Sequence, residues 1–192
     1  HAARDFLQNT GRSQIQWFDQ SESQQALYFR PSAADRYQPI ASPGLRARLF
    51  DRLEHQGIVM ISSYQHLVQA SRKEPEPQRF LFVFCKAELP DDASAAERAA
   101  FERGEGGALM PVICVDKTPD EVPYFDVLAE ESRATGQDWD MVFVAAMSGR
   151  GGHAPSSDEA QQPLTMMVES IRMGHLGNYL PLNKAGHAIS LD

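Results

Sequence analysis

Three runs of consecutive apolar residues stand out after residue 60: FLFVFC at 80–85, ALMPVICV at 108–115 and MVFVAAM at 141–147. A strand covered on both faces is apolar at every position, as parallel strands between two helix layers are. The pattern therefore predicts three buried strands. Pro111 has no N–H for the strand ladder, so the second strand should lie at an edge of the sheet or carry a bulge there.

Helices are predicted around these strands by apolar residues at helical spacing. The first stripe covers residues 61–68 and ends before RKEPEPQ, where two prolines prevent its continuation. The second helix follows the first strand. Ser94 and Glu97 there have the spacing of a capping box ahead of RAAFERG, which indicates the start of that helix.

Two further helices follow the second and third strands. Thr118, Pro119 and Glu121 suit the N-cap, N1 and N3 positions of the first of them. The other has an apolar stripe that begins near Pro163, a residue type favoured in the first turn, and closes at Gly174. Each predicted strand is thus followed by a predicted helix.

An alternation of strands and helices is typical of right-handed crossovers, which produce a parallel sheet. Near the C-terminus, YLPL and HAISL flank NKAG, a pattern typical of a hairpin. The predicted fold class is therefore α/β: a three-layer sandwich with a mainly parallel three-stranded core and a C-terminal antiparallel hairpin. We expect this compact domain to cover residues 60–192.

Residues 1–59 differ from the rest in composition, because they hold seven of the 18 basic residues, all of them Arg, and six of the 26 acidic ones. The stretch 30–44, RPSAADRYQPIASPG, has the Pro, Ser and Ala content of a linker. Helical spacing of leucines is found at Leu45–Leu53. We expect an N-terminal extension, partly disordered with one short helix, and Met60 is a hypothetical internal start.

The formal charge of −8 repels phosphate backbones and anionic lipid surfaces, so we expect no nucleic-acid partner and no membrane partner. The sequence contains no apolar run long enough to span a bilayer and no basic start followed by an apolar segment. Cys85 and Cys114 both lie within apolar runs, which indicates buried free thiols in a reducing compartment. We therefore expect a cytoplasmic protein.

Candidate binding residues follow the three predicted strands. Open parallel sheets bind ligands at the edge where the carboxyl ends of the strands converge. A mixed group of Lys, Asp and Arg at that edge can bind a small anionic ligand or a protein partner, and the alternative is that these charges only solubilise the strand ends. The predicted set is Lys86, Asp116, Lys117, Ser148, Gly149, Arg150, Gly151, Gly152 and His153.

The glycine-rich stretch SGRGGHAPSSDEAQQ, residues 148–162, separates the third strand from the last helix. Residues 149–154 have the G-x-G-x-x-A spacing that lets backbone N–H groups approach a pyrophosphate. In dinucleotide folds that loop runs directly into a helix, whereas the helix is expected here only near Pro163. A loop this long is either functional, with Arg150 on an anion and His153 titrating near neutrality, or a solvated flap.

Other catalytic and metal motifs are missing from the sequence. The six histidines show neither HExxH nor a spacing with paired cysteines, so we expect no structural zinc and no cofactor. No G-x-S-x-G elbow of a serine hydrolase occurs either.

Four phrases occur in order along the chain: EPQRFLFVFCKAELPDDAS, GEGGALMPVICVDKTPDE, VFVAAMSGRGG and NYLPLNKAG. With them, residues 60–192 resemble a family of small proteobacterial proteins of unknown function that commonly carry the label "ribonucleotide reductase subunit alpha". The resemblance implies no reductase activity, because a reductase large subunit is several times larger and has a redox cysteine pair. It assigns no role to any single residue.

Three functional hypotheses follow from the sequence. The first is a binding or regulatory module that acts through the carboxyl edge of the sheet and the 148–162 loop. The second is an enzyme or nucleotide-binding protein that acts on a small anionic substrate, with His153 or Asp116 as acid or base. The third is a subunit of a larger complex, which an exposed apolar patch on the terminal hairpin or on the Leu45–Leu53 helix would indicate. The sequence leaves the oligomeric state open.

Overall fold

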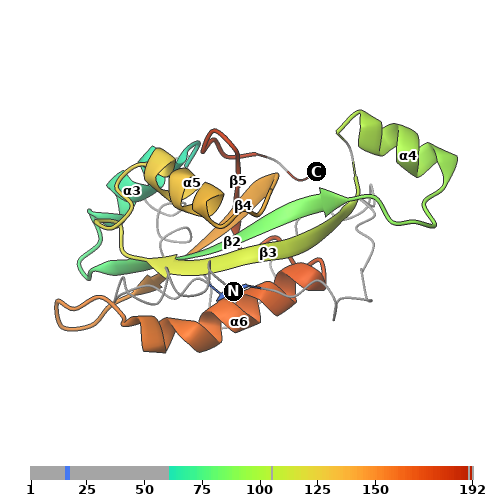
Figure 1. Cartoon of the computed structure of the whole chain (residues 1–192). Helices are drawn as coiled ribbons and strands as arrows, with labels where there is room; N and C mark the ends of the chain where they lie inside the picture. The colour runs from blue at the N-terminus through green and yellow to red at the C-terminus, as the bar shows by residue number, and fades with distance from the viewer. Residues whose placement is uncertain (1–15, 18–60, 105, 190, 192) are drawn as a thin grey trace.

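A computed structural model describes residues 16–17, 61–104, 106–189 and 191 of the chain. The linker expected at 30–44, the helix expected at Leu45–Leu53 and Met60 lie outside these residues. In chain order the elements are β1 (Gln16–Trp17), α3 (Tyr64–Ser71), β2 (Gln78–Glu88), α4 (Ala95–Glu102), β3 (Ala108–Lys117), α5 (Phe125–Ala134), β4 (Met141–Ser148), α6 (Ser157–Arg172) and β5 (Leu180–Asn183) (Figure 1).

The strands form one sheet of order β1–β3–β2–β4–β5, and every neighbouring pair is antiparallel. Phe82, near the middle of β2, lies opposite Val115 of β3 on one side and Val144 of β4 on the other. The predicted fold class, with its mainly parallel three-stranded core, is therefore wrong. Runs that are apolar at every position indicate burial on both faces, and an antiparallel sheet between helix layers meets that condition equally well.

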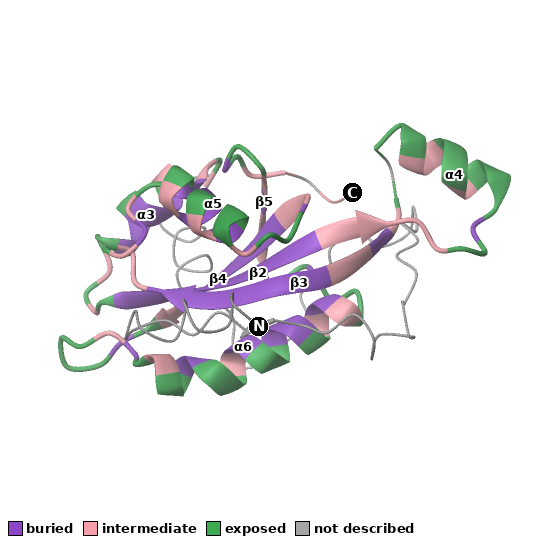
Figure 2. Ribbon diagram, viewed as in Figure 1, coloured by how far each residue is buried: buried purple, intermediate pink, exposed green. Residues whose placement is uncertain are grey.

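The connection between β2 and β3 explains why these two strands are not parallel. A parallel crossover requires its helix to pack on a face of the sheet, but α4 has no buried residue and projects beyond the end of the sheet (Figure 2). The two strands instead pair from Phe80 opposite Lys117 to Glu88 opposite Ala108, as the arms of a long hairpin. The predicted crossover helix therefore lies at the tip of that hairpin.

Helices cover both faces of the sheet, with α3 and α5 on one face and α6 on the other (Figure 1). The side chains of β2 alternate between the two layers. Phe80, Phe82 and Phe84 pack with α3 and α5 residues, whereas Leu81, Val83 and Cys85 pack with α6 residues. Full burial of each large apolar side chain stabilises the fold by about 1.5–3 kcal/mol, so β2 contributes to both cores.

The sequence predicted helices α3 and α4 correctly from their apolar stripe and their capping box, respectively. Tyr64, Leu67 and Val68 are the buried stripe of α3, and the Ser94–Glu97 capping box is present at the start of α4. These starts depend on hydrogen bonds and contacts between residues close in sequence.

The starts of α5 and α6 were predicted wrongly. Helix α5 begins at Phe125, just after Pro123, while the backbone N–H and hydroxyl of Thr118 donate to Glu121 in a separate turn. Helix α6 begins at Ser157, so Pro163 lies inside it and not in its first turn. The capping box of Ser156 with Glu159 and a buried stripe offset the interior proline.

The second predicted strand is irregular at the expected place. Phe84 pairs with Ile113 and Cys85 with Pro111, so Val112 is an extra residue in β3. The predicted bulge at Pro111 is confirmed, because the missing N–H falls where the ladder is interrupted.

At the C-terminal end, β5 is followed by a turn and an isolated bridge between Leu182 and Ala188. Across this turn, the Asn183 backbone N–H donates to the His187 carbonyl at 2.9 Å. Among the helices of the described residues, none combines the length and apolar character needed to cross a bilayer.

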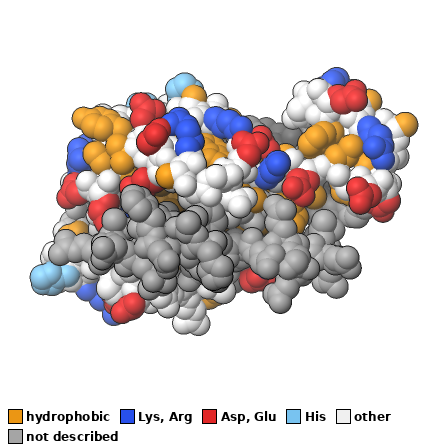
Figure 3. Space-filling view, viewed as in Figure 1, with side chains coloured by type: hydrophobic (Ala, Val, Ile, Leu, Met, Phe, Trp, Pro, Cys, Tyr) orange, Lys and Arg blue, Asp and Glu red, His pale blue; other side chains and the backbone are white. Residues whose placement is uncertain are grey.

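The outer surface mixes both signs of charge. On the face drawn in Figure 3, acidic and basic side chains are interspersed over α5 and α4. The large apolar side chains exposed within the described residues are Tyr124, Met166 and Met173. None of these three belongs to the terminal hairpin, where the hypothesis of a subunit in a larger complex placed an apolar patch.

Candidate functional site

The antiparallel sheet divides the predicted site residues between its two ends. Since β3 and β4 both run opposite to β2, their last residues lie beside the first residues of β2. Asp116 and Lys117 of β3 and Ser148 of β4 therefore share one end of the sheet. Lys86 lies toward the other end, opposite Met110, and is not brought together with them.

The glycine-rich segment forms a tight turn. The backbone N–H groups of Arg150 and His153 each donate to the other's carbonyl, at 3.0 and 3.1 Å. Gly151 and Gly152 between them have φ angles of +60° and +81°, as a two-residue hairpin turn of type I′ requires. A Cβ on Gly149 would lie 1.9 Å from the His153 carbonyl oxygen, so this position also needs glycine.

The turn holds an anion, but this anion belongs to the chain. The N–H groups of Gly151 and Gly152 donate to the two carboxylate oxygens of Glu76, at 3.1 and 2.7 Å. Glu76 lies in the segment between α3 and β2, so the turn fastens that segment to the end of β4. The side chains of Arg150 and His153 are exposed.

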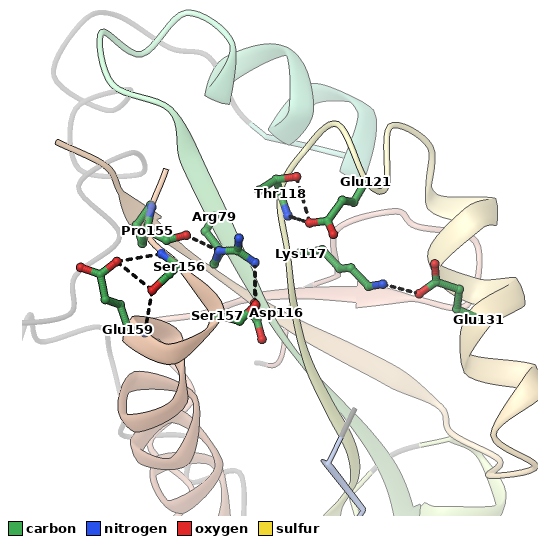
Figure 4. A network of polar contacts seen from close by, with 10 residues as sticks. All are labelled: Arg79, Asp116, Lys117, Thr118, Glu121, Glu131, Pro155, Ser156, Ser157 and Glu159. Atoms are coloured by element: carbon green, nitrogen blue, oxygen red, sulfur yellow. Dashed lines mark hydrogen bonds and ion pairs between the residues drawn. The ribbon is translucent and has the colours of Figure 1, made fainter. Parts of the chain in front are cut away.

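A buried ion pair that the sequence analysis did not predict lies at the same end of the sheet. Arg79, the second residue of β2, is 9% exposed and Asp116 is 3% exposed. The Arg79 Nη1 group donates to Asp116 Oδ2 at 2.5 Å, and its Nε group donates to the Pro155 carbonyl. Ser157 completes the network, since its hydroxyl donates to Asp116 Oδ2 at 2.8 Å (Figure 4). The pair thus joins β2, β3 and the start of α6.

One nitrogen of Arg79 is left for another partner. Within the described residues, its hydrogen bonds use Nε and Nη1 only. No fully buried side-chain nitrogen or oxygen there lacks a hydrogen-bond partner, so Nη2 has contact with solvent. Two N–H donors of a nearly buried guanidinium therefore have no partner among the described residues.

Lys117, the neighbour of Asp116, points to the other helix layer because successive strand residues alternate between faces. Its ammonium group lies 2.8 Å from the carboxylate of Glu131 on α5. The lysine side chain is 11% exposed, so this ion pair is partly buried (Figure 4). Asp116 and Lys117 are thus each paired, and on opposite sides of the sheet.

An open depression of about 630 Å³ lies above the buried ion pair. One wall is the start of α6 and the other is the turn between β3 and α5, with Arg79 from β2 between them (Figure 4). The described residues in its lining are Arg79, Thr118, Asp120, Glu121, Ser156, Ser157 and Asp158. None of the nine predicted site residues is in this lining, although Asp116 bonds two of the residues that are.

Two carboxylates near the depression, Glu121 in its lining and Glu159 in the first turn of α6, are held in their ionised form. Burial raises the pKa of Glu121, but hydrogen bonds from the Thr118 N–H and hydroxyl and the charge of Lys117 outweigh it, and the pKa is lowered. Hydrogen bonds from the Ser156 N–H and hydroxyl lower the pKa of Glu159. The lining itself contains the acidic residues Glu121 and Asp120 on one wall, Asp158 on the other, and Arg79 between them.

In the described part of the chain, no group of three His, Cys, Asp or Glu side chains is placed to hold a metal ion. Cys85 and Cys114 are buried, and neither forms a disulfide. Burial raises the pKa of the Cys85 thiol, which keeps it protonated and unreactive near neutral pH.

Arg79 was not among the predicted binding residues, because these were expected only at the carboxyl ends of the strands and Arg79 lies at the start of β2. A signal was present, since this arginine stands directly before a run of buried apolar residues. A charge in that position must be paired when the strand is buried on both faces.

The chain was also compared with protein-family models, curated proteins and solved structures, and none of them matches. The resemblance to the proteins labelled as a reductase subunit therefore stays a prediction.

Proposed function

We propose that this protein is a binding module whose ligand enters the depression beside Arg79. The observation that carries the proposal is that a nearly buried arginine lines the depression and that its Nη2 group has no hydrogen-bond partner among the described residues. The rest of that guanidinium is fixed by Asp116 and by the Pro155 carbonyl, so its remaining donors are held in one direction. A guanidinium held this way suits an oxygen-bearing anionic group such as a carboxylate or a phosphate.

The segment after β4 has a part in this proposal. Its residue Pro155 supports Arg79, and Ser156, Ser157 and Asp158 line one wall of the depression. The Gly151–Gly152 turn holds the segment in place through Glu76 and is itself occupied. The predicted loop thus supports the binding surface and does not cradle a phosphate with its glycines.

The enzyme hypothesis is less favoured by the geometry. Asp116 is committed to Arg79 and Ser157, and neither Asp116 nor His153 is among the residues that line the depression. The two residues that the sequence offered as acid or base therefore do not face a ligand bound there.

The proposal can be tested by NMR titration of the ¹⁵N-labelled full chain with acetate, succinate, inorganic phosphate, glycine and longer ω-amino acids. We expect at least one of them to shift the amide signals of residues 118–121 and 156–158. Arg79→Lys replaces the planar guanidinium by a single ammonium group. It should weaken binding of this compound at least about tenfold, which corresponds to about 1.4 kcal/mol. The matched control is Arg133→Lys, at an exposed arginine of α5.

A second variant covers the case in which Arg79→Lys does not fold. The side chain of Asp120 is 93% exposed, so Asp120→Trp adds bulk at the rim without disturbing the core. It should abolish binding. The proposal is wrong if no compound shifts these amides, or if folded variants bind as well as the wild-type chain.

A further inference from the structure

The charges around the depression are unequal. Arg79 is its only basic lining residue among those described, and Asp116 directly neutralises it. Three acidic residues, Asp120, Glu121 and Asp158, line the walls. A purely anionic ligand would meet Arg79 but would be repelled by the walls.

These acids are placed on both sides of the arginine. Glu121 and Asp120 belong to the turn after β3, and Asp158 belongs to the first turn of α6. Asp120 has a long contact with Arg72 at 3.8 Å, and its side chain is 93% exposed. Asp158 is exposed as well, so both carboxylates are accessible to a positively charged group that lies in the depression.

The arrangement therefore has two kinds of subsite. The floor presents guanidinium donors to an oxygen-bearing group, and the walls present carboxylates to a cationic group. The volume of about 630 Å³ is ample for a molecule of amino-acid size, because small-molecule pockets commonly have about 300–1,000 Å³.

From this arrangement we infer that the ligand is a small zwitterion, with a carboxylate on Arg79 and an ammonium group on Asp120 or Asp158. This inference rests on the proposed binding function and specifies the class of ligand. It departs from the small anionic ligand expected from the sequence, because only the folded chain brings the acidic residues of the two walls to either side of Arg79.

The test uses matched sets of three compounds. Glycine, β-alanine, 4-aminobutyrate and 5-aminopentanoate sample different separations of ammonium and carboxylate. Each is compared with the carboxylate that lacks the amine and with the amine that lacks the carboxylate, in NMR titrations of the full chain at low salt. We expect at least one zwitterion to bind about fivefold or more tightly than both of its analogues, as two exposed charge contacts allow.

Charge-neutral variants identify the walls. Asp120→Asn or Asp158→Asn, whichever removes the carboxylate that pairs with the ammonium group, should weaken binding of the zwitterion about two- to fivefold and should not weaken binding of its carboxylate analogue. The matched control is Asp126→Asn, which removes an exposed acid in the first turn of α5, outside the lining. Higher salt should reduce the preference for the zwitterion.

The outcomes separate the two proposals. If a carboxylate binds at the depression as tightly as its zwitterion, the inference is wrong and the binding function stands. If an amine alone binds as tightly as its zwitterion, the arginine anchor and the inference are both refuted. If nothing shifts the lining amides, both proposals fall.

Discussion

Removing one partner of the Arg79–Asp116 pair should destabilise the protein far more than removing both. The two side chains are 11% and 4% exposed, so little water can replace a lost partner. In Asp116→Leu, the guanidinium would keep only the Pro155 carbonyl and the Ser157 hydroxyl as partners. A buried charge stranded in this way costs about 3–5 kcal/mol, a large share of the roughly 5–15 kcal/mol that holds a domain together.

The double variant Arg79→Met/Asp116→Leu removes both charges and fills the space with apolar atoms. Replacement of a whole buried ion pair is often neutral, so we expect this variant to lose less than about 2 kcal/mol. The coupling energy between the two positions should therefore be several kcal/mol. This is well above the deviation of about 0.3–0.5 kcal/mol within which the effects of mutations at independent sites usually add.

Urea unfolding and thermal unfolding, each followed by circular dichroism, give the free energy of unfolding and the melting temperature of all four proteins of this cycle. We expect each single variant to lower the melting temperature by roughly 6–20 °C, at about 2–4 °C per kcal/mol for a chain of this size. The double variant should melt close to the wild-type chain. Additive losses would refute the reasoning, because they would mean that neither charge depends on the other for compensation.

Three further perturbations probe the elements around the site. Pro163→Ala restores an N–H that can donate to the Glu159 carbonyl in α6. It should raise the free energy of unfolding by about 2 kcal/mol, because proline also restricts the unfolded chain and this partly offsets the gain. An unchanged urea midpoint would contradict this. Glu76→Gln removes the carboxylate from the glycine turn, so the two glycine amides should exchange with deuterium severalfold faster, whereas an exposed control on α5, Glu130→Gln, should leave them unchanged. Hydrogen bonds from Ser156 lower the pKa of Glu159, so the stability that the ionised Glu159 contributes is complete above the ordinary carboxyl pKa and is lost as the pH falls through the lowered value. Glu159→Gln should therefore reduce the loss of stability below the ordinary carboxyl pKa, and an acid-induced loss equal to that of the wild-type chain would refute this assignment.

Where the elements lie was largely determined by residues that are close in sequence. The three apolar runs are β2, β3 and β4, and the capping box of Ser94 with Glu97 starts α4. Pro111 marks the bulge in β3 because its missing N–H interrupts the ladder wherever the strand pairs. Such signals depend on burial and on hydrogen bonds between residues that are close in sequence, so the sequence pattern predicts them directly.

Local signals also misled where two of them competed. Pro163 and Ser156 each mark a helix start, and only the capping box at Ser156 is used. The proline is tolerated inside α6 because the helix buries Leu164, Met167 and Ile171 against the sheet. The stabilisation from this burial depends on contacts with distant parts of the chain, so the sequence of the helix alone does not give it.

Strand direction and the site were decided by tertiary structure. Whether α4 packs on the sheet or stands beyond it determines whether β2 and β3 are antiparallel, and the residues of α4 alone satisfy either arrangement. Antiparallel pairing brings the first residues of β2 beside the last residues of β3, and so joins Arg79 to Asp116 across 37 positions of sequence. That contact places a guanidinium between two acidic walls, because the energy of a buried charge depends on which partners the fold brings to it.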